Sequence, residues 1–150
     1  MKINVIIVLL VCFSLQSMFS QERLSLSLKL DTQKTVNESE HFYLMEITNK
    51  ASTNLEFNIS IENTKCKNVK AIKQVNLNQS MLNKDKSKGL DQINIKPGTS
   101  KEFYIKLSRP KNTKLDTWNC SEVKAVSKTG ESLSNSVLIK SLIPDPKKFN

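Results

Sequence analysis

The chain offers few side chains from which a catalytic or metal site could be built. His41 is its one histidine, and a nucleophilic triad needs a histidine beside a serine or cysteine. His41 opens an almost continuously apolar run, which is typical of a histidine at the edge of a strand. Zinc sites need clustered histidines, cysteines and carboxylates, and blue-copper sites need two histidines with a cysteine. The sequence therefore predicts no metal and no cofactor.

Carboxylates could still serve a glycosidase, which needs only two of them. Five glutamates lie on predicted strands, but the alternation of apolar and polar residues turns most of them towards solvent. The three glycines of the chain cannot supply a phosphate-binding loop of the G-x-G-x-x-G or P-loop type. We therefore expect the protein not to be an enzyme. The glutamates are Glu46, Glu56, Glu62, Glu102 and Glu122.

Cysteines indicate the redox compartment. Cys12 falls in the predicted export signal, which leaves Cys66 and Cys120 with one possible intramolecular pairing. An oxidising compartment would let this disulfide form, and the chain-entropy model gives it about 4 kcal/mol of stabilisation. Two separately buried thiols are the alternative. A disulfide here would be structural, because no C-x-x-C spacing is present.

Lysines crowd two regions, and each is a candidate interaction surface for an anionic partner. Neither region is interleaved with aromatic residues as nucleic-acid platforms are, and solvated loops are the alternative explanation. Trp118 is expected to pack over the two cysteines as part of the core. If it is exposed instead, it becomes an anchor for a partner. The lysines are Lys65, Lys67, Lys70 and Lys73 in one region, and Lys84, Lys86 and Lys88 in the other.

The N-terminus has the three-part layout of a secretory signal: Lys2, the apolar run Val5 to Phe13, and a small, polar segment ending at Ser20. The apolar run is too short to span a bilayer, which takes about 20 residues. Lipidation at Cys12 is an alternative, although Val11 stands where a small residue is expected. We predict a signal peptide over 1–20, one domain over 21–143 and a flexible tail over 144–150.

Without Lys2 the chain carries 22 basic and 14 acidic residues, a net charge of +8. Export argues against nucleic acid as the partner, whereas an anionic glycan or an envelope surface fits the compartment. The alternative is that the charge of a lysine-rich chain only keeps its surface soluble. We expect a secreted or periplasmic protein that does not span the membrane.

Apolar and polar residues alternate along most of the remaining chain, which indicates half-buried strands. Arg23–Leu30, Leu55–Glu62 and Lys101–Ser108 show the pattern most clearly. The polar segment Thr48–Asn54 separates two apolar runs, which we expect to pair as antiparallel neighbours. About seven or eight strands with frequent turns predict an all-β fold, a single immunoglobulin-like antiparallel sandwich. The remaining predicted strands are His41–Thr48, a stretch around Ala71–Leu77, Gln92–Ile95, Trp118–Val126 and Ser134–Lys140.

Two stretches, ITNKASTNLEFNISI (47–61) and INIKPGTSKEFYIKL (93–107), resemble immunoglobulin-like and fibronectin type III-like modules of exported bacterial proteins. The Phe-Ser before Gln21 resembles the signal ends of Bacteroidetes-type secreted proteins. Trp118 departs from the antibody pattern, because it lies two residues before the second cysteine. The resemblance implies a non-catalytic interaction or structural accessory module that binds a protein or a glycan. A proteinase inhibitor is the alternative, since some bacterial inhibitors resemble such domains.

Overall fold

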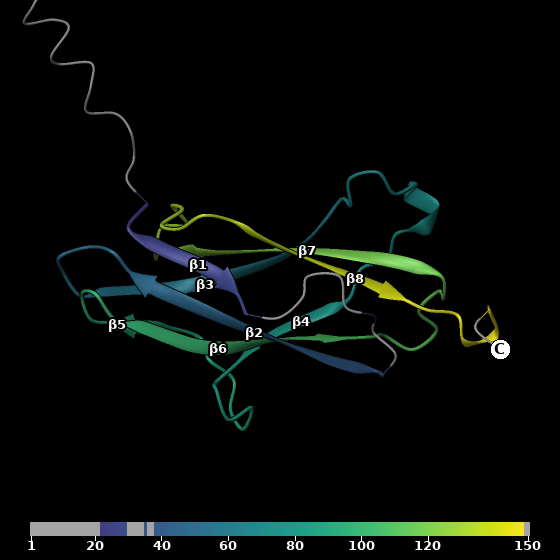
Figure 1. The fold of residues 1–150 in the computed structure, drawn as a ribbon, viewed down its shortest axis with the longest axis horizontal. Coiled ribbons are helices and arrows are strands. Elements are labelled where there is room, and N and C mark those ends of the chain that lie inside the picture. The colour runs from purple at the N-terminus through teal and green to yellow at the C-terminus, as the bar shows by residue number, and fades with distance from the viewer. Residues whose placement is uncertain (1–21, 30–34, 36–37, 149–150) are drawn as a thin grey trace, which may run out of the picture.

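The computed structural model describes residues 22–29, 35 and 38–148, so the predicted signal segment lies outside the described residues. Eight strands and two short 3-10 helices make up the regular structure of this part (Figure 1). The strands are β1 (Leu24–Leu28), β2 (Glu40–Asn49), β3 (Leu55–Thr64), β4 (Asn78–Leu82), β5 (Ile93–Ile95), β6 (Ser100–Ser108), β7 (Thr117–Val126) and β8 (Val137–Ile143), and the helices are η2 (Ala71–Lys73) and η3 (Pro146–Lys148).

The strands form two four-stranded sheets in which all neighbours are antiparallel. The first sheet has the order β1-β2-β6-β4 and the second sheet the order β5-β3-β7-β8. An immunoglobulin constant-type domain opposes a sheet of strands A, B, E and D to one of C, F and G. This chain has that arrangement, with β5 added beside β3. The predicted all-β immunoglobulin-like sandwich is confirmed.

The core lies between the two sheets and follows from strict alternation along the strands. Tyr43, Met45 and Ile47 of β2 are fully buried, as are Phe57 of β3 and Ile105 of β6. Successive side chains of a strand point to opposite faces, so the residues between them turn outward. The apolar positions in the alternating sequence pattern are therefore the positions whose side chains face the core.

The expected pairing of the two strands that flank Thr48–Asn54 is wrong. β2 hydrogen-bonds to β1 and β6 in the first sheet, whereas β3 lies in the second sheet. The buried Asn49 explains the crossing, because its amide nitrogen donates to the carbonyls of Thr53 (2.8 Å) and Ile95 (3.1 Å). These bonds fix a turn that leads the chain from one sheet to the other.

The strand expected around Ala71–Leu77 is also displaced. Ala71–Lys73 forms η2, and the strand at this point of the fold is β4, which begins at Asn78. Only Gln79 and Met81 of β4 face inward, so this short edge strand shows little alternation in the sequence. Pro97-Gly98 forms a tight turn between β5 and β6: Gly98 has φ +66° and the Thr99 amide donates to the Lys96 carbonyl.

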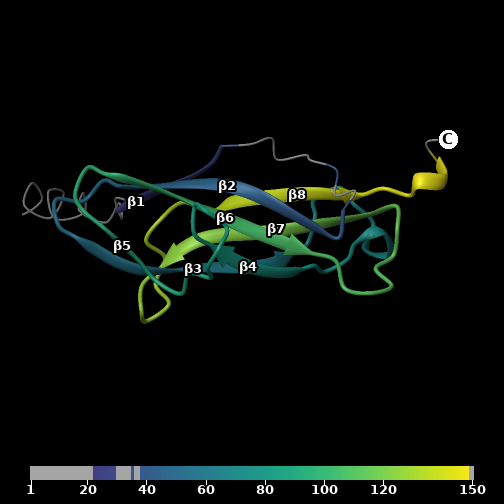
Figure 2. The same ribbon diagram turned by 90° about the horizontal axis from the view of Figure 1, so that it is seen from below.

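The C-terminal segment extends beyond β8 at one end of the elongated sandwich (Figure 2). It forms η3, and the Lys148 ammonium lies 2.6 Å from the Asp116 carboxylate. The flexibility predicted for 144–150 stays a prediction.

Candidate functional site

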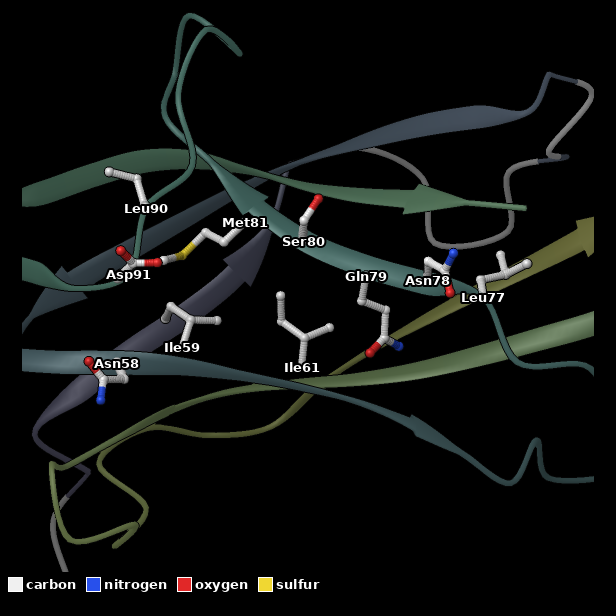
Figure 3. Close-up of a pocket in the computed structure, with 10 residues that line it drawn as sticks. All are labelled: Asn58, Ile59, Ile61, Leu77, Asn78, Gln79, Ser80, Met81, Leu90 and Asp91. Carbon is white, nitrogen blue, oxygen red and sulfur yellow. The ribbon is translucent and has the colours of Figure 1, made fainter. Parts of the chain in front are cut away.

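A groove opens between β3 and β4, which belong to opposite sheets (Figure 3). β5 pairs with β3 only from Leu55 to Phe57. From Asn58 to Glu62, the described part of the chain places no strand against this side of β3. Alternate residues of an antiparallel strand turn their NH and CO groups away from the partner. This stretch of β3 therefore directs backbone donors and acceptors into the groove.

The groove has a mixed lining, in which apolar side chains from both strands stand among polar ones. Ile59 and Ile61 point from β3 towards Gln79 and Met81 on β4 (Figure 3). Both isoleucines are on the inward face but remain partly exposed, whereas Phe57 on the same face is fully buried. The groove has a volume of about 620 Å³, within the range of about 300–1,000 Å³ that is usual for ligand sites.

Different contacts close the two ends of the groove. At one end, the chain before Ile93 leaves β3 and crosses to β4, where the Leu90 amide donates to the Met81 carbonyl at 3.1 Å. At the other end, the Asn63 side chain accepts from the Leu77 amide (3.2 Å) and donates to its carbonyl (3.0 Å). The free stretch of β3, Asn58–Glu62, is therefore bounded at both ends and has about the length of a typical strand.

A polar network between the sheets supports the second of these ends. The Asn119 amide donates to Asn63 Oδ1 at 2.6 Å and to the Val75 carbonyl at 3.1 Å. Ser121 Oγ donates to Asn119 Oδ1 at 2.9 Å and accepts from the Gln79 amide at 2.7 Å. Since Gln79 belongs to the first sheet and Ser121 to the second, the network links the two sheets beside the groove.

Neither the groove nor this network was predicted from the sequence. Alternation marks Ile59 and Ile61 as inward residues, but it does not say which part of a strand lacks a neighbour. A signal for the network was present, because Thr117, Asn119 and Ser121 are polar and occupy the inward phase of β7. Buried polar side chains need hydrogen-bond partners, so three of them in succession indicate a buried network.

The predicted disulfide Cys66–Cys120 is confirmed, with a Cα–Cα distance of 5.3 Å. It lies on the outer face of the second sheet, because Cys120 has the opposite phase to the inward Asn119 and Ser121. Trp118 shares this outer face and is half-buried, so its predicted place in the core is wrong. The Lys140 ammonium lies 4.5 Å from the centroid of the Trp118 ring.

The first lysine region forms the loop around η2. Lys73 Nζ lies 2.5 Å from the Asp116 carboxylate, which Lys148 also contacts. Bonds from Lys148 and Lys73, in that order of effect, lower the pKa of Asp116 to about 2. Lys65, Lys67 and Lys70 are exposed and, among the described residues, form no ion pair.

The second lysine region is the loop after β4, and it lies on the other side of the sandwich from η2 (Figure 1). Lys84 lies 2.7 Å from Glu102, which raises the lysine pKa and lowers that of the glutamate. Lys86 Nζ lies 4.5 Å from the ring centroids of both Phe42 and Tyr104. The structure therefore does not bring the two lysine regions together.

The remaining candidate residues occupy ordinary surface and strand positions. His41 lies in β2 with its ring 5.0 Å from that of Tyr43. Glu46 pairs with Lys29 and Glu56 with Lys128, at 2.8 Å and 3.3 Å. The residues that the structure describes contain no cluster of three metal-binding side chains, and no helix among them is long and apolar enough to cross a membrane.

No protein-family model matches this sequence, and comparison with curated proteins finds no similar one. Among solved structures, a FixG-related protein from Vibrio parahaemolyticus is similar over 83% of this chain and 99% of its own, at 13% identity and a TM-score of 0.53. The two chains therefore share a fold.

Two other structures are similar at lower TM-scores. A family 123 glycoside hydrolase from Clostridium perfringens matches at 11% identity and 0.47, over 75% of this chain and 23% of its own. PapD-like domain 7 of human CEP192 matches at 6% identity and a TM-score of 0.46, over 87% of this chain and 92% of its own. Neither likeness bears on activity, so the expectation that the chain is not an enzyme stays a prediction. The fibronectin type III-like and Bacteroidetes-type assignments also stay predictions.

Proposed function

We propose that this chain is an exported protein-interaction module whose β3–β4 groove accepts an extended segment of a partner protein. The open edge of β3 beside the partly exposed Ile59 and Ile61 is the observation that carries the proposal. Exposed strand edges pair readily with other chains, and many recognition domains bind peptides as an added strand. The signal-like N-terminus and the disulfide support action outside the cytosol.

The position of β5 defines how the guest segment would lie. Phe57 is opposite Ile93, so an earlier start of β5 would have set Asp91 opposite Ile59. At that point the chain contacts β4 instead of β3, so the position opposite Ile59 is open. The guest strand would occupy this position and run antiparallel to β3, as β5 does. Opposite Asn58–Glu62 it would contain about five residues, or about 17 Å of strand.

The lining of the groove defines the chemistry of the partner. Alternate guest residues would contact Ile59 and Ile61, so these residues should be apolar and the ones between them polar. Asp91 is the one charged residue among those that line the groove. It lies where the C-terminal end of the guest would be, which favours lysine or arginine there and disfavours an acidic segment. The proteinase-inhibitor alternative stays a prediction.

The test is binding of a fluorescent peptide, acetyl-Val-Ser-Val-Thr-Val-Lys-amide, to the purified protein. We expect saturable binding, together with slower hydrogen exchange of those Asn58–Glu62 amides that face the groove. A peptide that is N-methylated at alternate residues should bind at least about tenfold more weakly, because two or more backbone hydrogen bonds are lost.

Two substitutions of equal charge provide the matched comparison. Ile59→Glu places an inward charge in the groove, a device that natural edge strands use against pairing. Ser60→Glu adds the same charge on the outward face of β3, opposite Lys124. We expect Ile59→Glu to abolish binding and Ser60→Glu to preserve it. Thermal unfolding curves of both variants should show that both proteins are folded. Equal binding by the two variants, or protection confined to other strands, would overturn the proposal. So would self-association that saturates the groove in place of the peptide.

A further inference from the structure

A second concave site lies at the outer face of the second sheet, between the η2 loop and the start of β7. It has a volume of about 240 Å³. We call it the Trp118 pocket. It is separate from the β3–β4 groove, with which it shares no lining residue. The pocket is lined by Asn68, Val69, Lys70, Lys73, Asp116 and Trp118.

Several bonds hold the loop that forms one wall of this pocket. The disulfide ties Cys66 to β7. The Gln74 side chain accepts from the Cys66 amide at 2.8 Å and donates to the Val69 carbonyl at 2.7 Å. The Val75 amide donates to the Trp118 carbonyl at 2.9 Å. The pocket is therefore a built concavity in which the lining residues are positioned before any ligand arrives.

The pocket carries an excess of positive charge. Asp116 is its one carboxylate, and it is shared by Lys73 and Lys148. Lys70 adds a cation that forms no ion pair within the described part of the chain, and Lys140 adds another above the Trp118 ring. The local charge therefore remains positive after Asp116 is neutralised, which attracts an anionic ligand.

We propose that the Trp118 pocket binds an acidic sugar unit of an anionic glycan. The indole ring offers an apolar surface with a polar edge, against which the C–H face of a sugar ring can pack. Lys70 and Lys73 can donate charge-assisted hydrogen bonds to a carboxylate or sulfate. Asp116 and the Asn68 amide provide acceptors for hydroxyl groups.

Two other anionic partners fit the pocket less well. A single-stranded nucleic acid needs a row of aromatic platforms, and the pocket has one indole. A lipid surface is favoured by Ile72, which is 71% exposed on η2. However, a planar layer of phosphates does not enter a concavity, and it would meet the ionised Asp116 without hydroxyls to offer it. Binding to vesicles is therefore an outcome of the test.

The test uses the tryptophan itself, because Trp118 is the only one in the chain. Its emission is followed during titration of the purified protein with tetragalacturonate, with neutral galactotetraose and with phosphatidylglycerol vesicles. We expect a saturable change with tetragalacturonate alone, weaker at about 300 mM than at about 50 mM salt.

Two lysine substitutions of equal charge distinguish the pocket from general attraction. Lys70→Gln should weaken binding about tenfold, since one charge-assisted contact is lost. Lys88→Gln, in the loop on the other side of the sandwich, should leave affinity within about twofold. Equal weakening by both variants, no change in emission with tetragalacturonate, or a change with vesicles alone would each overturn the proposal. Unaltered thermal unfolding of Lys70→Gln excludes loss of the fold as the cause.

Discussion

Replacing Asn119 by alanine should strongly destabilise the sandwich, although Asn119 belongs to no apolar cluster. The side chain is 1% exposed and makes three hydrogen bonds, to Asn63, Val75 and Ser121. Each bond contributes about 1 kcal/mol net, and without Asn119 the buried Ser121 hydroxyl loses the acceptor of its proton. We therefore expect Asn119→Ala to lower the free energy of unfolding by about 3 kcal/mol. For a domain of this size the corresponding fall in Tm is about 10 °C.

The assay is thermal and urea unfolding of the wild type, Asn119→Ala and the control Asn78→Ala. Asn78 is exposed at the start of β4, so its replacement should change stability by less than about 0.5 kcal/mol. The double variant Asn63→Ala/Asn119→Ala should cost less than the sum of the single variants, because the two side chains share a bond. A cost for Asn119→Ala below about 1 kcal/mol would refute this assignment of the network.

Three further predictions concern the disulfide and two charged side chains. Replacing Cys66 and Cys120 by serine should lower the free energy of unfolding by about 4 kcal/mol in the chain-entropy model, as measured by urea unfolding, since the sequence separation is 54. Asp116 has a pKa lowered to about 2 from 3.8, chiefly by Lys148; its contribution is complete above about pH 4 and is lost as the pH falls through 2. The Tm difference between wild type and Asp116→Asn should therefore be present at pH 5 and vanish near pH 2. Lys86→Ala should cost up to about 1 kcal/mol in the same assay, through loss of its contacts with two aromatic rings.

The sequence predicted the faces of the strands better than their partners. Alternation over Leu55–Glu62 and Lys101–Ser108 identified the inward residues, since the period of a strand fixes its faces locally. It could not assign β2 and β3 to different sheets, because that depends on Asn49, whose bonds reach Ile95 far along the chain. The cysteines were a stronger signal, because two of them allow one pairing. The groove required knowledge of where β5 begins, which no local pattern contains.

The two lysine regions differ in the contacts that their ammonium groups make within the fold. Lys84 forms an ion pair with Glu102, and Lys86 lies over the rings of two aromatic residues. Two of the three lysines in the loop after β4 therefore contact residues of the first sheet. That loop fits the explanation that basic charge serves local structure and solubility. Lys65, Lys67 and Lys70 have no such ion pairs among the described residues. They belong to a loop that the disulfide fixes, and Lys70 lines a pocket together with the half-buried Trp118. Removal of charge at η2 should therefore affect binding, whereas removal after β4 should affect stability. The two regions look equivalent in the sequence, and their neighbours in the fold distinguish them.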